Sequence, residues 1–91
     1  MPKSRESLLE SITRAVLEIK TIDPSQVVES AYLAADLGFG SIDTIDLFFE
    51  IGRETSIEVA IPALIAHINS GASAPRRDFT VKEIIDFLMM Q

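Results

Sequence analysis

The chain contains no cysteine, no tryptophan and a single histidine, His67. Without cysteine it can form no disulfide, no thiolate nucleophile and no cysteine-ligated metal site. One imidazole cannot build a multi-histidine metal site, and it offers little for catalysis that depends on a histidine base. We therefore expect a protein that is not an enzyme and that holds no metal.

Basic side chains are also scarce, with 8 lysines and arginines against 14 aspartates and glutamates and a formal net charge of −6 at pH 7. This charge opposes binding to nucleic acids and anionic membranes, and it favours partners with basic protein surfaces. The longest apolar-rich stretch, Val59 to Ile68, is too short to span a bilayer, and residues 1–6 lack the apolar core of a signal peptide. We expect a monomeric, cytoplasmic protein without a transmembrane segment.

The length of 91 residues predicts a single domain, residues 1–91, with one modest core. A first helix is expected to start near Ser4 or Ser7, where Ser7 and Glu10 have the spacing of a capping box. Its apolar residues recur at helical spacing and predict one buried stripe. The stripe consists of Leu8, Ile12, Ala15, Val16 and Ile19.

The segment between the first helix and Gly40 shows no sustained period and predicts a long loop. Asp23-Pro24 is expected to end the helix and to begin a short helical turn, with Asp23 as its cap and Gln26 completing a capping box. Five apolar residues are expected to fasten the loop to the helices. These are Val27, Val28, Tyr32, Leu33 and Leu37.

The C-terminal third predicts two further helices separated by a loop. A short helix is expected from Pro62 through Ile68, and residues 70–78 read as a loop whose Arg76-Arg77 doublet can serve either the acidic second helix or a partner. Thr80 and Glu83 form a capping box for the last helix, and Phe79 can pack onto Ile84 as a hydrophobic staple. Its buried side is expected to contain Val81, Ile84, Ile85 and Leu88.

The most informative stretch leads through Gly38 and Gly40 to Ser41, where a second helix is expected to run to about Thr55. Serine is a preferred N-cap residue, so Ser41 can be a cap. The same position favours an esterified phosphate, because a helix N-terminus stabilises anions. One apolar face is expected to carry Ile42, Ile45, Phe49 and Gly52, widened by Phe48 and Ile51.

Four carboxylates follow helical i, i+3 and i+4 spacing along this second helix and form one edge. We name them the acidic edge: Asp43, Asp46, Glu50 and Glu54. Like charges at this spacing cost an isolated helix about 0.2–0.5 kcal/mol per pair. The edge is therefore either an ordinary solvated face or a surface that binds a basic partner.

The run from Asp36 to Leu47, followed by Ser56-Ile57-Glu58-Val59, resembles the centre of an acyl carrier protein. The resemblance extends more weakly over nearly the whole chain and implies an all-α fold, a small four-helix bundle with a long first loop and a short third helix. In that family the serine at the start of the second helix carries a 4′-phosphopantetheine arm, which a phosphopantetheinyl transferase attaches from coenzyme A. The arm holds acyl groups as thioesters.

By this resemblance Ser41 is the attachment residue, and the acidic edge docks the transferase and acyl-handling enzymes such as synthases, reductases, dehydratases and acyltransferases. Fatty-acid, polyketide or related acyl metabolism is implied. Aromatic residues at helical spacing are usually core, but the resemblance also implies an acyl-chain cleft lined by Ile42, Ile45, Phe48 and Phe49. The chain departs from the family at Gly40, where aspartate is usual. The alternative is therefore a carrier-fold interaction module that has lost its serine chemistry.

Overall fold

A computed structural model of the protein describes residues 4–57, 62, 63, 66 and 78–90. The named elements are the α-helices α1 (Arg5–Ile19), α2 (Ser41–Thr55) and α4 (Val81–Met89) and the 3₁₀ helix η1 (Pro24–Gln26). Pro62, Ala63 and Ala66 are also helical. The part of the chain described contains no strand, only one isolated antiparallel bridge between Tyr32 and Thr80. The expected all-α class is confirmed. Most of the helix expected at Pro62–Ile68 and the loop expected at residues 70–78 lies outside the described residues.

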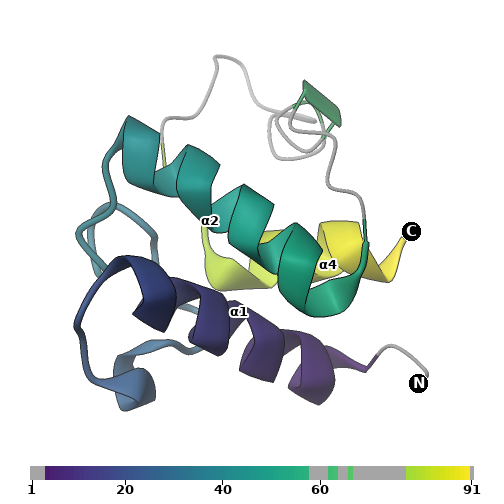
Figure 1. Ribbon diagram of the computed structural model, residues 1–91, viewed down its shortest axis with the longest axis horizontal. Coiled ribbons are helices and arrows are strands. Elements are labelled where there is room, and N and C mark those ends of the chain that lie inside the picture. Colours follow the sequence, from purple (N-terminus) through teal and green to yellow (C-terminus); the bar gives the residue numbers. More distant parts are fainter. Residues whose placement is uncertain (1–3, 58–61, 64–65, 67–77, 91) are drawn as a thin grey trace.

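Helix α1 packs against both α2 and α4, and Figure 1 shows it running in the opposite direction to α2. Ser4 is its N-cap, since Ser4 Oγ accepts a hydrogen bond from the Ser7 N–H at 3.1 Å. A start near Ser4 is confirmed, and the capping box at Ser7 and Glu10 is wrong. The helix ends at Ile19, before Asp23, and four of the five stripe residues are buried. These are Leu8, Ile12, Ala15 and Val16.

The long loop between α1 and α2 begins with the short helix η1. Asp23 caps it, and the Gln26 side chain accepts a hydrogen bond from the Asp23 N–H, so the expected capping box is confirmed. Val28 and Tyr32 are exposed, so they are wrongly predicted as fasteners of the loop. The buried side chains of the loop are those of Val27, Ala31, Leu33, Leu37 and Phe39.

The loop is held by the start of α4, which lies far away in the sequence. Residues 29–35 need partners for their backbone polar groups because they belong to neither a helix nor a sheet. Asp78 supplies two, accepting from the N–H groups of Ala34 and Ala35 at 2.9 and 3.2 Å. The backbone bonds run from Leu33 N–H to Phe79 O (3.0 Å), from Val81 N–H to Ala31 O (3.0 Å) and from Lys82 N–H to Glu29 O (2.8 Å).

Helix α4 begins as expected, with Thr80 and Glu83 forming a capping box. The predicted buried residues of this helix are confirmed, and Phe87 is buried with them. The Phe79 ring before the cap stacks on Phe48 of α2, with ring centroids 5.8 Å apart. The aromatic residue at this helix start therefore joins α4 to α2 in the common core.

An ion-pair network ties the beginning of α1 to the loop and to α4. Arg5 donates to Glu29 Oε1 through Nη2 and Nε at 2.5 and 3.2 Å, and through Nη1 to Asp86 Oδ1 at 2.7 Å. Lys82 also reaches Asp86, at 3.1 Å. These bonds raise the pKa of Arg5, chiefly through Glu29, and lower the pKa of Asp86, chiefly through Arg5. The loop that leads to Ser41 is thereby attached at Glu29 to the start of α1.

Candidate functional site

Ser41 is the first residue of α2, and Gly40 occupies the N-cap position with an extended backbone (φ −87°, ψ −176°). The interpretation of Ser41 as the cap is therefore wrong by one residue. The first backbone N–H groups of a helix lack intrahelical acceptors, and they give its N-terminus a partial positive charge. Ser41 thus stands at the end of α2 where an attached anion is stabilised.

The residues that precede Ser41 are held by backbone hydrogen bonds and by a buried side chain. Gly38 has φ +73°, a left-handed conformation that glycine adopts without steric cost. The N–H of Gly38 donates to Ala34 O at 3.1 Å, and the N–H of Phe39 donates to Leu33 O at 2.9 Å. Because the Phe39 side chain is also buried, the residues directly before Ser41 are fixed on the core.

Gly40 is the position at which the family that the sequence resembles usually has aspartate. The backbone conformation at Gly40 does not require glycine. Extended φ and ψ values suit any residue, and a Cβ at this position would meet only Asp43 Oδ2, at 4.0 Å. An aspartate would therefore fit here sterically. Nothing in the structure explains why this chain has glycine.

Asp43 lies in the first turn of α2 and connects this turn to Gly40, at the end of the loop, and to Lys20, at the end of α1. Its carboxylate accepts a hydrogen bond from the Gly40 N–H at 3.3 Å and pairs with Lys20 Nζ at 3.2 Å. These two contacts, the Gly40 bond first, hold the pKa of Asp43 below its usual range. Lys20 follows the last residue of α1, and its Nζ lies 5.8 Å from the centroid of the Phe39 ring. Asp43 therefore stabilises the start of α2 in addition to contributing a negative charge to the acidic edge.

Three of the four acidic-edge carboxylates are paired with basic side chains of the same chain. Besides Lys20–Asp43, Arg53 pairs with Glu50 and Arg14 pairs with Glu54, each at 2.8 Å. Asp46 is exposed and forms no ion pair with the residues that the structure describes. Sequence reasoning missed Lys20 and Arg14, because helical spacing within α2 carries no information about side chains that α1 supplies.

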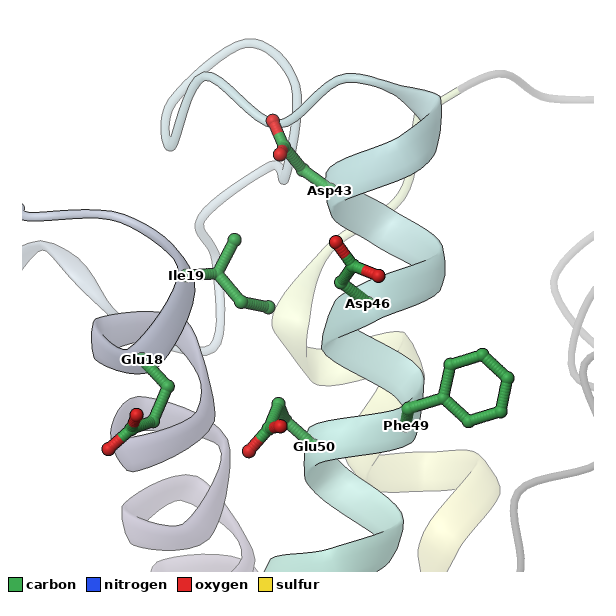
Figure 2. Close-up of a pocket in the computed structure, with 6 residues that line it drawn as sticks. All are labelled: Glu18, Ile19, Asp43, Asp46, Phe49 and Glu50. Atoms are coloured by element: carbon green, nitrogen blue, oxygen red, sulfur yellow. The ribbon is translucent and has the colours of Figure 1, made fainter.

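A hollow of 410 Å³ lies between α1 and α2, and its lining includes most of the acidic edge. Figure 2 shows Ile19 on α1 pointing toward α2 and Glu50 on α2 pointing toward α1, with Glu18 on the α1 side of the hollow and the Phe49 ring pointing away from α1. Glu18 was not expected to belong to the site, since it reads as an ordinary charge on the solvated side of α1. The lining residues are Glu18, Ile19, Asp43, Asp46, Phe49 and Glu50.

The apolar residues of α2 divide between two sides of the helix. Phe48 is 3% exposed and lies in the core, whereas Phe49 is 64%, Ile42 76% and Ile45 45% exposed. The expectation that Ile42, Ile45 and Phe49 form the core-facing side is wrong. The residues that face the core are Leu47, Phe48 and Ile51.

Gly52 does not provide free space beside the aromatic residues. A Cβ at Gly52 would lie 3.3 Å from the carbonyl oxygen of Ile57, closer than an ordinary van der Waals contact. The glycine therefore lets the chain after α2 fold back against the helix. That turn begins at Ser56, which has φ +58°.

The described residues contain neither a metal-binding cluster nor a membrane-spanning helix. No group of three or more His, Cys, Asp or Glu side chains there could hold a metal ion. Likewise, none of the helices in the described ranges is both long enough and apolar enough to cross a bilayer.

The chain is similar to several acyl carrier proteins. It is 36% identical to the acyl carrier protein of Thermotoga maritima over 56 residues, which make up 62% of this chain and 69% of that protein. It is 42% identical to the mitochondrial acyl carrier protein of Neurospora crassa over 40 residues, 44% of this chain and 30% of that one. With the acyl carrier protein AcpXL of Rhizobium etli it shares 23% identity over 75 residues, 82% of each chain. No family model and no solved structure matches.

Proposed function

Because the chain belongs to the acyl carrier protein family, and so is a carrier rather than an enzyme, we propose that Ser41 Oγ bears a 4′-phosphopantetheine arm. The arm holds acyl intermediates as thioesters, in fatty-acid, polyketide or related acyl metabolism, and residues 1–91 act as one carrier domain. The observation that carries this proposal is the position of Ser41 as the first residue of α2, behind a loop fixed on the core. Intact mass after incubation with coenzyme A and a broad-specificity transferase tests it.

The surroundings of Ser41 suit a phosphodiester. A negative charge near a helix N-terminus is stabilised by about 0.3–1 kcal/mol at an exposed site. Since the chain has no cysteine, the sulfur of any thioester has to come from the attached arm. The protein's part is then to present the serine in a fixed position and to offer a surface that partner enzymes recognise.

We assign partner recognition to the acidic edge. The phosphopantetheinyl transferase and the acyl-handling enzymes would meet it with basic surfaces, because complementary charge speeds association and orients the two proteins. Asp46 is its most accessible member for an incoming cation, since it is exposed and its three neighbours on the edge are paired within the chain.

Replacing Asp46 by lysine should slow modification of Ser41 by the transferase about tenfold at low salt, because charge complementarity mainly sets the association rate. The difference should shrink as ionic strength rises and exposed charges are screened. The measurement is the initial rate of mass gain at two or more salt concentrations. Glu10→Lys is the matched control, because Glu10 is exposed on α1, lies outside the hollow and undergoes the same charge change. Equal slowing in both variants would refute docking at the acidic edge.

We further propose that an attached acyl chain rests against the exposed apolar side chains of α2. Ile42, Ile45 and Phe49 follow one another at i, i+3 and i+7, so they share the side of the helix that begins at Ser41. Phe48, also implied as lining by the resemblance, is occupied in the core by its contact with Phe79. The acyl-binding surface is therefore smaller than the four residues implied by the sequence.

A long-chain acyl form should melt higher than the form with a free thiol arm. Each methylene removed from water contributes about 0.8 kcal/mol, and each kcal/mol raises the Tm of a domain this small by about 4–8 °C. Thermal unfolding of both forms measures the shift. Phe49→Ala should reduce it, whereas Met90→Ala, which truncates an exposed apolar residue beyond α4, should leave it unchanged. Identical Tm values for the two wild-type forms would show that the chain stays in water.

A further inference from the structure

The acidic edge does not meet a partner as four open carboxylates. Lys20 and Arg14 of the α1 segment reach across to Asp43 and Glu54, with N–O distances of 3.2 and 2.8 Å. A partner's lysine or arginine that approaches these positions has to displace a cation that the chain itself supplies. The number of negative charges on α2 is therefore larger than the number of carboxylates that are free to pair with a partner's cations.

Lys20 is the cation best placed to control access to Ser41. It pairs with the carboxylate two residues beyond the serine, and its ammonium also lies 5.8 Å from the centroid of the Phe39 ring, which is itself buried. A cation near an aromatic face gains electrostatic attraction from the ring. Phe39 and Asp43 thus hold Lys20 from two sides, and of these three residues Asp43 also lines the hollow.

Building on the proposed carrier function, we propose that Lys20 is a specificity-determining residue, an internal competitor for Asp43 that restricts which basic partners can dock beside Ser41. A partner that depends on a contact with Asp43 has to replace Lys20. A partner that binds through Asp46 alone does not, because neither Asp46 nor Glu18, which also lines the hollow, forms an ion pair with the described residues. Lys20 therefore favours the second kind of partner.

The expected size of the effect follows from the exposure of the pair. Ion pairs that stay in contact with solvent are weak, and Lys20 and Asp43, although half-buried, still keep 31% and 34% of their side-chain surface accessible. Removing the competitor should therefore raise partner affinity about two- to fivefold, not by orders of magnitude. The gain should appear at low salt and fade at high salt.

The test compares Lys20→Gln with Lys82→Gln. Both variants remove one positive charge and one ion pair to an aspartate, but the Lys82–Asp86 pair lies on α4, outside the acidic edge. The first readout is association with an immobilised broad-specificity phosphopantetheinyl transferase without coenzyme A. Because this enzyme has to reach Ser41, two residues from Asp43, we expect it to contact Asp43 as well as Asp46 and therefore to compete with Lys20. The second is mass gain when coenzyme A is supplied. Lys20→Gln should associate about two- to fivefold more tightly than Lys82→Gln at low salt, whereas Lys20→Arg, which keeps the pairing charge, should match the wild type.

The two readouts separate this inference from the proposed function. Mass gain in the wild type, with equal association of Lys20→Gln and Lys82→Gln, overturns the role of Lys20 and leaves the carrier function standing. Tighter association of Lys20→Gln without mass gain in any variant supports the role of Lys20 and overturns attachment at Ser41. Thermal unfolding of each variant verifies that it folds, and weaker binding by Lys20→Gln in its folded state would also overturn the inference.

Discussion

Ser41→Ala should gain no phosphopantetheine, while the wild type gains one group per chain. Alanine has no hydroxyl to esterify, so the expected loss is complete. The fold should survive, because Gly40 rather than Ser41 occupies the N-cap position of α2 and no capping side chain is removed. We expect a stability change within about 0.5 kcal/mol, as for ordinary surface substitutions. Intact mass and thermal unfolding provide the two measurements.

Ser30→Ala is the matched control for this experiment, since Ser30 is exposed in the long loop and lies outside α2. It should gain mass as the wild type does. If Ser41→Ala were still modified, the attachment site would lie elsewhere. If the wild type never gained mass with any transferase, the carrier chemistry would be refuted, and the chain would be better described as an interaction module with the carrier fold.

Phe48→Ala should destabilise the protein by about 3–5 kcal/mol, the usual cost of truncating a buried phenylalanine. The side chain is almost fully buried and stacks on Phe79 with an interplanar angle of 20°, so its removal leaves a cavity between α2 and α4. Small domains are stable by only about 5–15 kcal/mol, and the variant should be close to unfolding at physiological temperature. Denaturant unfolding with an unchanged m-value measures the loss.

Phe49→Ala is the control, because it makes the same chemical change one position along the same helix. Phe49 is mostly exposed, and its truncation should cost less than about 1 kcal/mol. Losses of similar size in the two variants would contradict the division of the aromatic pair between core and surface. They would also contradict the assignment of Phe49 to the acyl-binding surface.

The parts of the fold that were predicted correctly rest on local signals. The capping boxes at Asp23 and Thr80 need only residues three apart, and both form as expected. The buried stripe of α1 is also correct, because its apolar residues occupy a single side of the helix. The capping-box spacing also misleads once: Ser7 and Glu10 form no capping box, because α1 begins one turn earlier with Ser4 as its cap.

The orientation of α2 could not be read in the same way. Its apolar residues occupy most of the helix circumference, so periodicity allows more than one buried side. Contact with α1, and with Phe79 just before α4, selects the side of Leu47 and Ile51, and it leaves Phe49 exposed. The sequence predicts the side that includes Ile42 because Ile42 directly follows Ser41. Nothing in the sequence of α2 alone distinguishes this side from the side of Leu47 and Ile51.

The charge pairs of the candidate site were also beyond sequence reasoning. Arg14 and Glu54 are 40 residues apart and meet only because α1 and α2 pack side by side. The acidic edge was identified correctly as a row of carboxylates, but how far its charges are neutralised depends on the neighbouring helix. The predicted span of the second helix, Ser41 to about Thr55, is confirmed, and only its cap was placed one residue too late, since glycine and serine both cap helices well.

The attachment of the long loop to the start of α4 has a consequence for synthesis on the ribosome. Ala34 and the carboxylate of Asp78 that binds its N–H are 44 residues apart. At about 5–20 residues per second, the ribosome needs roughly 2–9 s to translate that interval. During this time the loop before Ser41 lacks its anchoring acceptors, even after Ser41 itself has been made. A transferase that recognises the folded loop would therefore pass over nascent chains and act on those whose C-terminal helix has already been completed.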